Sequence, residues 1–280
     1  MSLKEFLRPT SVGEAVKQLS GSAARQPLAG GTFLGLHAPV KTRGLVDLSH
    51  VGLRYITGKS DQLVLGAMTT FADIANEART GALGGVLAGT ATEPLRHMIT
   101  VGGNLMIPLR WSDLPVLLTV LDAEVVLRQK GTRRITIDTL YAQSPKAALR
   151  QGEIVKEVRL PRMKGVRLSR RKLLRMHDDV PALHVAVALH LPRTRMHGVR
   201  IAFVAQKSLP TRLLTAERVL EGASPASDII TAAAEAAMAE CGTLSDSRYS
   251  SEYLREMLGV FVTSCVQRCT GVAGEDQADD

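Results

Sequence analysis

The chain is poor in several residue types and patterns that mark common classes of protein. Phe, Trp and Tyr make up only 4% of its 280 residues, which argues against a surface that stacks single-stranded bases. No stretch approaches the roughly 18 uncharged residues needed to span a bilayer, and the first six residues lack the apolar core of a signal peptide. These absences predict a cytoplasmic protein without a membrane span or a nucleic-acid partner.

Cysteine is also scarce, with only Cys241, Cys265 and Cys269 in the chain. They form no Cys-x-x-Cys pair, and no histidine stands near them at a metal-binding spacing. We interpret them as buried thiols, which behave as small hydrophobic side chains. The sequence therefore predicts no metal site.

Recognisable catalytic and nucleotide-binding motifs are absent too. The chain has no Gly-x-Gly-x-x-Gly fingerprint, no phosphate loop ending in Gly-Lys-Ser/Thr, and no serine in a nucleophile elbow. Four histidines that lie close in sequence lack metal spacing, and we interpret them as surface or strand residues: His177, His184, His190 and His197. No catalytic residue is predicted.

What the chain does contain is typical of a globular protein, with 45% hydrophobic and 22% charged residues. Its length predicts two domains or two lobes. The net charge of +8 would attract anions, and the densest basic group lies within residues 162–175. A solvated face or a docking surface for an acidic partner explains that group better than nucleic acid does.

Hydrophobic periodicity predicts strands mixed with short helices over the first 160 residues, an α+β or α/β arrangement. The expected strands end at Leu28 or span residues 45–48, 62–67, 123–128, 134–137 and 154–160. Expected helices follow capping boxes at Ser11/Glu14 and Thr70/Asp73 and occupy residues 85–92 and 113–121. Beyond a boundary within residues 161–175 come strands 184–191 and 199–205, helices 211–221, 226–241 and 250–268, and a polar, acidic tail expected to be disordered.

Two glycine pairs are the most informative local feature. Gly30-Gly31 and Gly102-Gly103 each follow a short apolar run and are interpreted as strand-to-loop junctions. Glycine pairs let consecutive backbone amides turn toward one concavity, and such a nest binds anions, above all phosphate. Two such loops in one chain predict a two-sided grip on a diphosphate.

The order of motifs along the chain resembles the FAD-binding (medium) subunit of the molybdenum hydroxylases, the carbon monoxide dehydrogenase and xanthine dehydrogenase group. The resemblance runs from about residue 6 to residue 268. It rests on the series Phe6-Leu7-Arg8-Pro9, Ala29-Gly30-Gly31-Thr32, Leu45-Val46-Asp47-Leu48, Arg96, Thr100-Val101-Gly102-Gly103-Asn104, Ser112-Asp113-Leu114-Pro115, Leu121-Asp122-Ala123-Glu124-Val125, Lys172, Arg175, Asp178-Asp179-Val180, Pro210-Thr211-Arg212 and Ser251-Glu252-Tyr253-Leu254-Arg255.

This resemblance implies an FAD-binding fold of the vanillyl-alcohol-oxidase (PCMH) type. An FAD-binding domain would occupy residues 1–165, as two α/β subdomains of about 1–55 and 56–165. A C-terminal domain of a small antiparallel sheet with a helical bundle would occupy residues 166–270, and the disordered tail residues 271–280.

The resemblance also implies the cofactor-binding residues. The two glycine segments would carry the FAD pyrophosphate: Ala29, Gly30, Gly31, Thr32, Phe33 and Leu34, and Thr100, Val101, Gly102, Gly103 and Asn104. Asp113 falls at a position on the ribose or adenine side, and Lys172 at a basic position near the flavin. The family often has aspartate or serine in place of Phe33, and usually Ala-Ser-Pro where this chain has residues 108–111.

The implied function is that of an electron-transfer subunit. It would take electrons from [2Fe–2S] clusters on a small partner subunit, reduced in turn by a molybdopterin-containing large subunit, and pass them to NAD⁺ or another acceptor. Two alternatives stay open: a free-standing FAD reductase of the same fold, and a structural subunit that has lost FAD.

Overall fold

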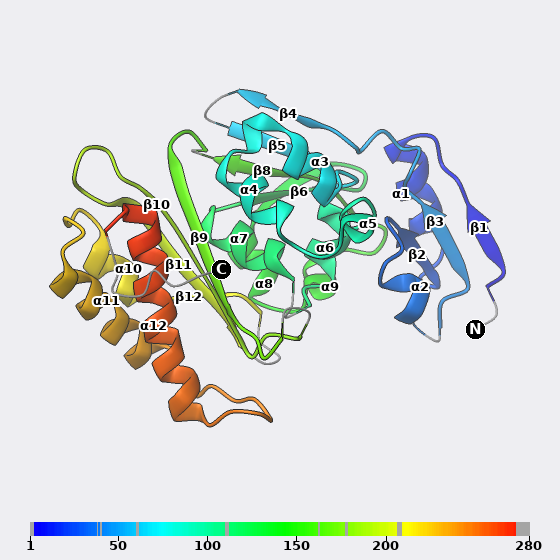
Figure 1. Cartoon of the computed structure of the whole chain (residues 1–280). Helices are drawn as coiled ribbons and strands as arrows, with labels where there is room; N and C mark the ends of the chain where they lie inside the picture. The colour runs from blue at the N-terminus through cyan, green and yellow to red at the C-terminus, as the bar shows by residue number, and fades with distance from the viewer. Residues whose placement is uncertain are drawn as a thin grey trace. The chain divides into compact units, whose positions relative to one another are not determined.

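The structure, a computed structural model, divides into two compact units (Figure 1). It describes residues 3–37, 39, 41–59, 62–109, 112–161, 163–176, 179–205 and 209–272. The first unit comprises Met1–Pro108 and Asp122–Met163, and the second comprises Leu109–Leu121 and Lys164–Asp280.

The first unit begins with a small parallel sheet. Its strands lie in the order β1 (Glu5–Leu7), β3 (Gly44–Asp47) and β2 (Arg25–Leu28). Helix α1 (Val12–Ser20) connects β1 to β2, as parallel strands require, and the short helix α2 (Leu34–His37) follows β2. The strands expected to end at Leu28 and to span residues 45–48 are confirmed.

Only half of the first predicted capping box forms. The Ser11 hydroxyl accepts a hydrogen bond from the Glu14 amide (3.2 Å), as expected of an N-cap residue. The Glu14 carboxylate accepts instead from the amide of Thr10 (2.9 Å), one residue before the cap. The second predicted box is complete, with Thr70 and Asp73 each accepting from the other's amide.

A five-stranded antiparallel sheet forms the rest of this unit's framework. Its strands lie in the order β4 (Ile56–Lys59), β5 (Gln62–Gly66), β8 (Ile154–Pro161), β6 (Glu124–Arg128) and β7 (Thr132–Thr136). The associated helices are α3 (Phe71–Asn76), η1 (Ala78–Thr80), α4 (Ala82–Ala88), α5 (Glu93–Arg96), α6 (Val101–Met106), α8 (Ile137–Tyr141) and α9 (Pro145–Ala148). The helix expected at 85–92 is wrong in its bounds, because α4 spans Ala82–Ala88 and a separate helix begins at Glu93, with Pro94 in its first turn.

The second unit is built on a four-stranded antiparallel sheet. Its strands lie in the order β12 (Thr211–Arg212), β11 (His197–Ala205), β10 (Leu183–His190) and β9 (Val166–Leu173). The helices are α7 (Asp113–Val120), α10 (Leu214–Leu220), α11 (Ser227–Glu240) and α12 (Ser251–Thr270). The three helices expected at the C-terminal end are confirmed.

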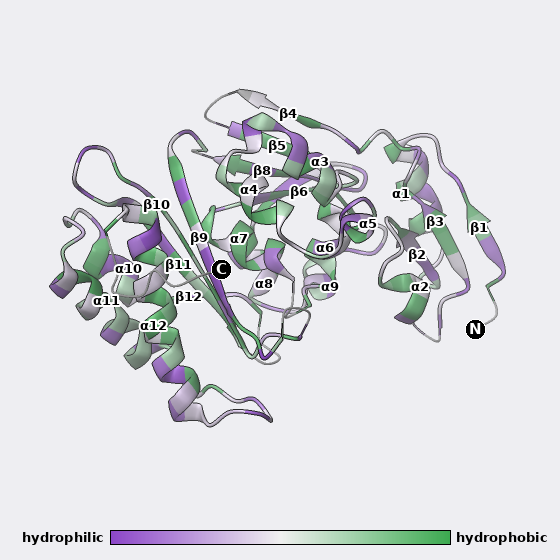
Figure 2. Ribbon diagram, viewed as in Figure 1, coloured by the Kyte–Doolittle hydropathy of each residue, from purple (hydrophilic) through white to green (hydrophobic). Residues whose placement is uncertain are grey.

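Strand β10 is buried on both faces, because helices cover the sheet on either side. Leu183, Val185 and Val187 join the core with α10, α11 and α12. Helix α7, whose residues are all buried and mostly apolar (Figure 2), contacts β10 and β11. The alternate residues of β10, His184 among them, are therefore available to α7.

Strand β9 corrects the interpretation of residues 161–175 as a basic boundary segment. It is an edge strand whose charged side chains alternate between the two faces of the sheet. Arg167 donates to the carbonyl of Cys269 (2.9 Å) and Arg171 to Ser264 (3.2 Å), both on α12. Arg170 and Lys172 contact Asp113 on α7. These four residues are thus engaged with helices of their own unit.

Segment 109–121 groups with the second unit, although the expected domain boundary near residue 165 assigns it to the first. The physical reason is that α7 packs on the sheet of β9–β12. Of the expected acidic tail, residues 273–280 lie outside the described part of the chain, as do Arg110 and Trp111.

Candidate functional site

The first glycine pair lies in the loop between β2 and α2, where each glycine is required for a different reason. Gly31 has φ +72°, in the left-handed region that side chains rarely adopt. A Cβ on Gly30 would lie 1.6 Å from the carbonyl oxygen of Met98. No other residue fits at position 30 without moving the chain.

This loop presents a run of backbone donors that the protein itself does not use. None of the amides from Gly30 to Leu34 has a hydrogen-bond acceptor among the described residues. All five residues are half-buried. Backbone amides in such a turn suit an anion with several acceptor oxygens, as the sequence predicted for this loop.

The second glycine pair differs from its prediction as a strand-to-loop junction. Gly102 and Gly103 lie in the first turn of α6, with Thr100 as the N-cap. The first amides of this helix all have acceptors within the protein: Val101 donates to Thr69 O (2.9 Å), Gly102 to Ala67 O (2.8 Å), Gly103 to Thr100 Oγ1 (3.2 Å) and Asn104 to Thr100 O (2.9 Å). The expected nest of amides is therefore wrong here.

Close approach explains the glycines of α6 instead. A Cβ on Gly102 would lie 2.9 Å from the Cβ of Ala67, and a Cβ on Gly103 would lie 2.9 Å from Thr100 Oγ1. The Cβ of Ala29 would lie 3.7 Å from the latter, an ordinary contact distance. The two glycine segments are thus neighbours in the first unit. Of the two, only the first segment has a run of amides without acceptors among the described residues.

Phe33 and His37 form an aromatic pair beside the first loop. Their rings stack with centroids 4.8 Å apart and planes inclined by 21°. Leu36, in the same short helix, is 82% exposed. Phe33, which departs from the family pattern, therefore has a partner within the chain.

The second unit contains a buried charged cluster at the start of α7, which we call the Asp113 cluster: Asp113, Arg170, Lys172 and His184. Asp113 is fully buried, and its Oδ1 lies 2.8 Å from Lys172 Nζ and 3.3 Å from Arg170 Nε. His184 Nε2 lies 3.4 Å from the same oxygen. His184 and Lys172 are opposed in the register of β10 and β9, which places them together.

Burial determines the charges of this cluster. It lowers the pKa of His184 to about 3, so the imidazole is neutral near neutral pH. Burial acts to raise the pKa of Asp113, but the neighbouring groups of His184, Lys172 and Arg170 hold it below its usual range. Burial also lowers the pKa of Lys172, opposed by the Asp113 carboxylate. The cluster thus brings one carboxylate together with two basic side chains and a neutral imidazole.

His184 is the strand residue that was one of its two interpretations, and it is fully buried in β10 rather than on the surface. Neither of its ring nitrogens has a hydrogen-bond partner among the described residues. A buried polar group in that state costs about 1–3 kcal/mol of folding stability. The signal that could have found it is a histidine among the apolar residues of β10.

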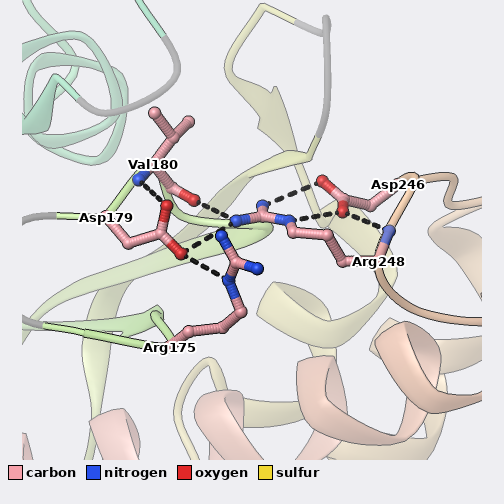
Figure 3. Close-up of polar contacts among 5 residues, drawn as sticks. All are labelled: Arg175, Asp179, Val180, Asp246 and Arg248. Atoms are coloured by element: carbon pink, nitrogen blue, oxygen red, sulfur yellow. Dashed lines mark hydrogen bonds and ion pairs between the residues drawn. The ribbon is translucent and has the colours of Figure 1, made fainter.

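A second polar network fixes the loop between β9 and β10 (Figure 3). Asp179 accepts from Arg175 Nε (2.8 Å) and from Arg248 Nη1 (3.2 Å). Arg248 also donates to the carbonyl of Val180 (2.8 Å) and to Asp246 (2.8 Å). This network ties the loop after Lys172 to the segment that precedes α12. His177 and Asp178 of the same loop lie outside the described residues.

The cysteines are free thiols, with Cys265 and Cys269 buried and Cys241 half-buried. Burial raises the pKa of Cys265 to about 12, which leaves it protonated and inert. In the described ranges, no group of histidine, cysteine and acidic side chains could hold a metal ion. No helix in that part of the chain is long and apolar enough to cross a membrane.

Two family descriptions match this chain. "FAD binding domain in molybdopterin dehydrogenase" matches residues 2–163, and "CO dehydrogenase flavoprotein C-terminal domain" matches residues 169–269. Among curated proteins, the glyceraldehyde dehydrogenase medium chain of Sulfolobus acidocaldarius is 26% identical over 264 residues, which are 91% of this chain and 94% of that protein. The carbon monoxide dehydrogenase medium chain of Hydrogenophaga pseudoflava is 27% identical over 269 residues, 92% and 94% of the two chains.

Solved structures agree with these matches. A chain of the Hydrogenophaga pseudoflava carbon monoxide dehydrogenase that lacks the Mo-pyranopterin moiety superposes with a TM-score of 0.87 at 26% identity. The superposition covers 96% of this chain and 98% of that one.

Proposed function

The chain belongs to the family of FAD-binding medium subunits of molybdopterin dehydrogenases, and from this premise we propose that it carries electrons between partner subunits and a final acceptor. The family, the PCMH-type fold and the cofactor FAD, all expected from the order of motifs, are confirmed by the matches and by the solved relatives. We propose in addition which subunits exchange electrons with this chain and which of its residues contact FAD.

The observation that carries the proposal is the run of amides from Gly30 to Leu34 without acceptors among the described residues. We assign this loop to the FAD pyrophosphate, whose oxygens would accept from those amides. The segment from Thr100 to Asn104 would shape the site by close approach, because its own amides are already bonded. When bound, the flavin supplies single-electron acceptance and two-electron donation.

Lys172 is proposed to contact the dinucleotide, and Asp113, which the resemblance places on the ribose or adenine side, is proposed to hold that lysine. The fully buried Asp113 carboxylate lies 2.8 Å from Lys172 Nζ, so it fixes the ammonium in a largely desolvated place, where a charge acts more strongly than in water. Lys172 would stabilise an anionic reduced flavin.

The proposed partners are a large subunit with molybdopterin and a small subunit with two [2Fe–2S] clusters. In support, the curated relatives are named as medium chains of dehydrogenases. We propose that substrate is oxidised on the large subunit, that electrons reach this chain through the small one, and that NAD⁺ or another acceptor takes them. A cytoplasmic location stays a prediction.

Bound flavin in the purified chain is the first test. The chain is expected to show absorbance bands near about 370 and 450 nm, which FAD gives when oxidised. A folded, colourless chain that rejects added FAD would contradict the proposal and favour a structural subunit. A stable monomer that is active without partners would favour a free-standing reductase.

A further inference from the structure

The buried imidazole of His184 is not explained by the packing of the second unit. It has no exposed surface, and neither ring nitrogen is hydrogen-bonded within the described residues. Folding alone would favour an apolar side chain of similar size at this place in β10, because an unpartnered polar group opposes burial. Departures from packing rules of this kind concentrate at functional sites.

The surroundings of the ring indicate what it acts on. Its Nε2 faces Oδ1 of Asp113 at 3.4 Å, and the same oxygen meets Lys172 and Arg170 at 2.8 and 3.3 Å. Three side chains from two neighbouring strands therefore converge on a single carboxylate oxygen at the start of α7.

A neutral polar ring suits this position better than either alternative. A third cation would place one more positive charge in a buried cluster, which is unfavourable. An apolar side chain would remove the polar neighbour on that side of the carboxylate. The imidazole is polar without being charged, so it constrains the carboxylate while leaving the net charge unchanged.

We propose that His184 is a positioning residue for FAD, which acts through Asp113 to hold Lys172 in the arrangement that receives the dinucleotide. The inference rests on the proposed function, since it requires that Lys172 contacts FAD. The imidazole would then contribute to the affinity for FAD and to the midpoint potential of the flavin. This role explains why an unpartnered polar side chain is kept where an apolar one would be more stable.

Three substitutions in the full-length chain separate the contributions of the ring. His184→Leu keeps bulk and removes polarity. His184→Gln places an amide nitrogen near the position of Nε2, which faces Asp113, whereas His184→Asn places one near Nδ1. The dissociation constant of FAD, the midpoint potential of the bound flavin and the thermal unfolding of the FAD-free chain are measured for each.

We expect His184→Leu to weaken FAD binding at least about tenfold, because the carboxylate that fixes Lys172 loses a polar neighbour. Its flavin midpoint potential is expected to fall, while its FAD-free chain unfolds at the wild-type temperature or above. His184→Gln is expected to stay within about threefold of wild type in affinity, and His184→Asn to resemble His184→Leu. The control is Val185→Ala on the opposite face of β10, which should lower the unfolding temperature and leave FAD affinity unchanged.

Two results would overturn the inference. One is a His184→Leu chain with wild-type affinity and potential; the other is loss of affinity only in parallel with loss of FAD-free stability, which assigns the ring a structural role. A wild-type chain that itself fails to bind FAD would instead overturn the proposed function, and the inference with it.

Discussion

At the scale of single residues, Gly30 is the position where the least change should have the largest effect. Gly30→Ala puts a methyl group 1.6 Å from the Met98 carbonyl oxygen, so the loop must move away from that neighbour. We expect a loss of about 2 kcal/mol or more in the free energy of unfolding, together with loss of bound FAD. Urea unfolding and flavin absorbance measure the two effects.

Gly35→Ala is the matched control for this change. A Cβ there meets nothing within 4 Å, and the residue lies in α2, where alanine is the better helix former. It should keep wild-type stability and FAD content. Equal behaviour of the two variants would mean that the approach of Gly30 to Met98 does not constrain the loop.

His184 gives the folded chain a pH dependence whose sign follows from burial. Its pKa falls from 6.5 to about 3 on folding, so between these values the unfolded chain binds more protons than the folded one. As pH drops below 6.5, the imidazole should lower the free energy of unfolding by about 1.4 kcal/mol per pH unit. Denaturant unfolding at a series of pH values should show a shallower slope for His184→Leu.

If His184→Leu kept the wild-type slope, the imidazole would have to be protonated in the folded chain. That result would remove the neutral ring from the Asp113 cluster.

At the scale of elements, Thr100 shows how a helix forms on a sequence that predicts a loop. Its hydroxyl caps α6 by accepting from the Gly103 amide (3.2 Å). Thr100→Ala should lower the free energy of unfolding by about 1 kcal/mol, measured by urea unfolding of the FAD-free chain. Thr100→Ser keeps the hydroxyl and should stay close to wild type, and an equal loss in both variants would contradict the capping role.

Elements with regular apolar patterns were predictable from the sequence, whereas others depended on tertiary contacts. Strands β6, β8 and β10 and the long helix α12 follow from their periodicity. Helix α6 does not, because two glycines weaken a helix locally, and carbonyls of Ala67 and Thr69, distant in sequence, supply acceptors for its first amides. Strand β9 was missed because charged side chains face both helices that flank it.

At the scale of the whole molecule, the candidate site could be predicted in part. The first glycine loop has amides without acceptors among the described residues, so its role at the pyrophosphate stays a prediction. The resemblance selects Asp113 and Lys172, which the structure pairs at 2.8 Å. Arg170 and His184 were not predicted, because their contact with Asp113 depends on the register of β9 and β10. The grouping of α7 with the second unit likewise depends on tertiary contacts, because α7 covers one face of the sheet that contains β10 and β11.

The proposed place in a larger complex predicts the composition of the native assembly. Purification of this chain from its native source should bring with it subunits that contain molybdenum and iron–sulfur clusters. Anaerobic titration of that complex with NADH should bleach the flavin bands if NAD⁺ is the acceptor. Isolation of the chain without such subunits would count against the electron-transfer role.

Amide hydrogen exchange in the full-length chain, with and without FAD, tests most directly whether the first glycine loop binds the pyrophosphate. We expect the amides from Gly30 to Leu34, which have no acceptor among the described residues, to exchange quickly and to become protected when FAD binds. The bonded amides from Val101 to Asn104 should change little. FAD binding that leaves exchange in the first loop unaltered would contradict the assignment of the pyrophosphate to these amides.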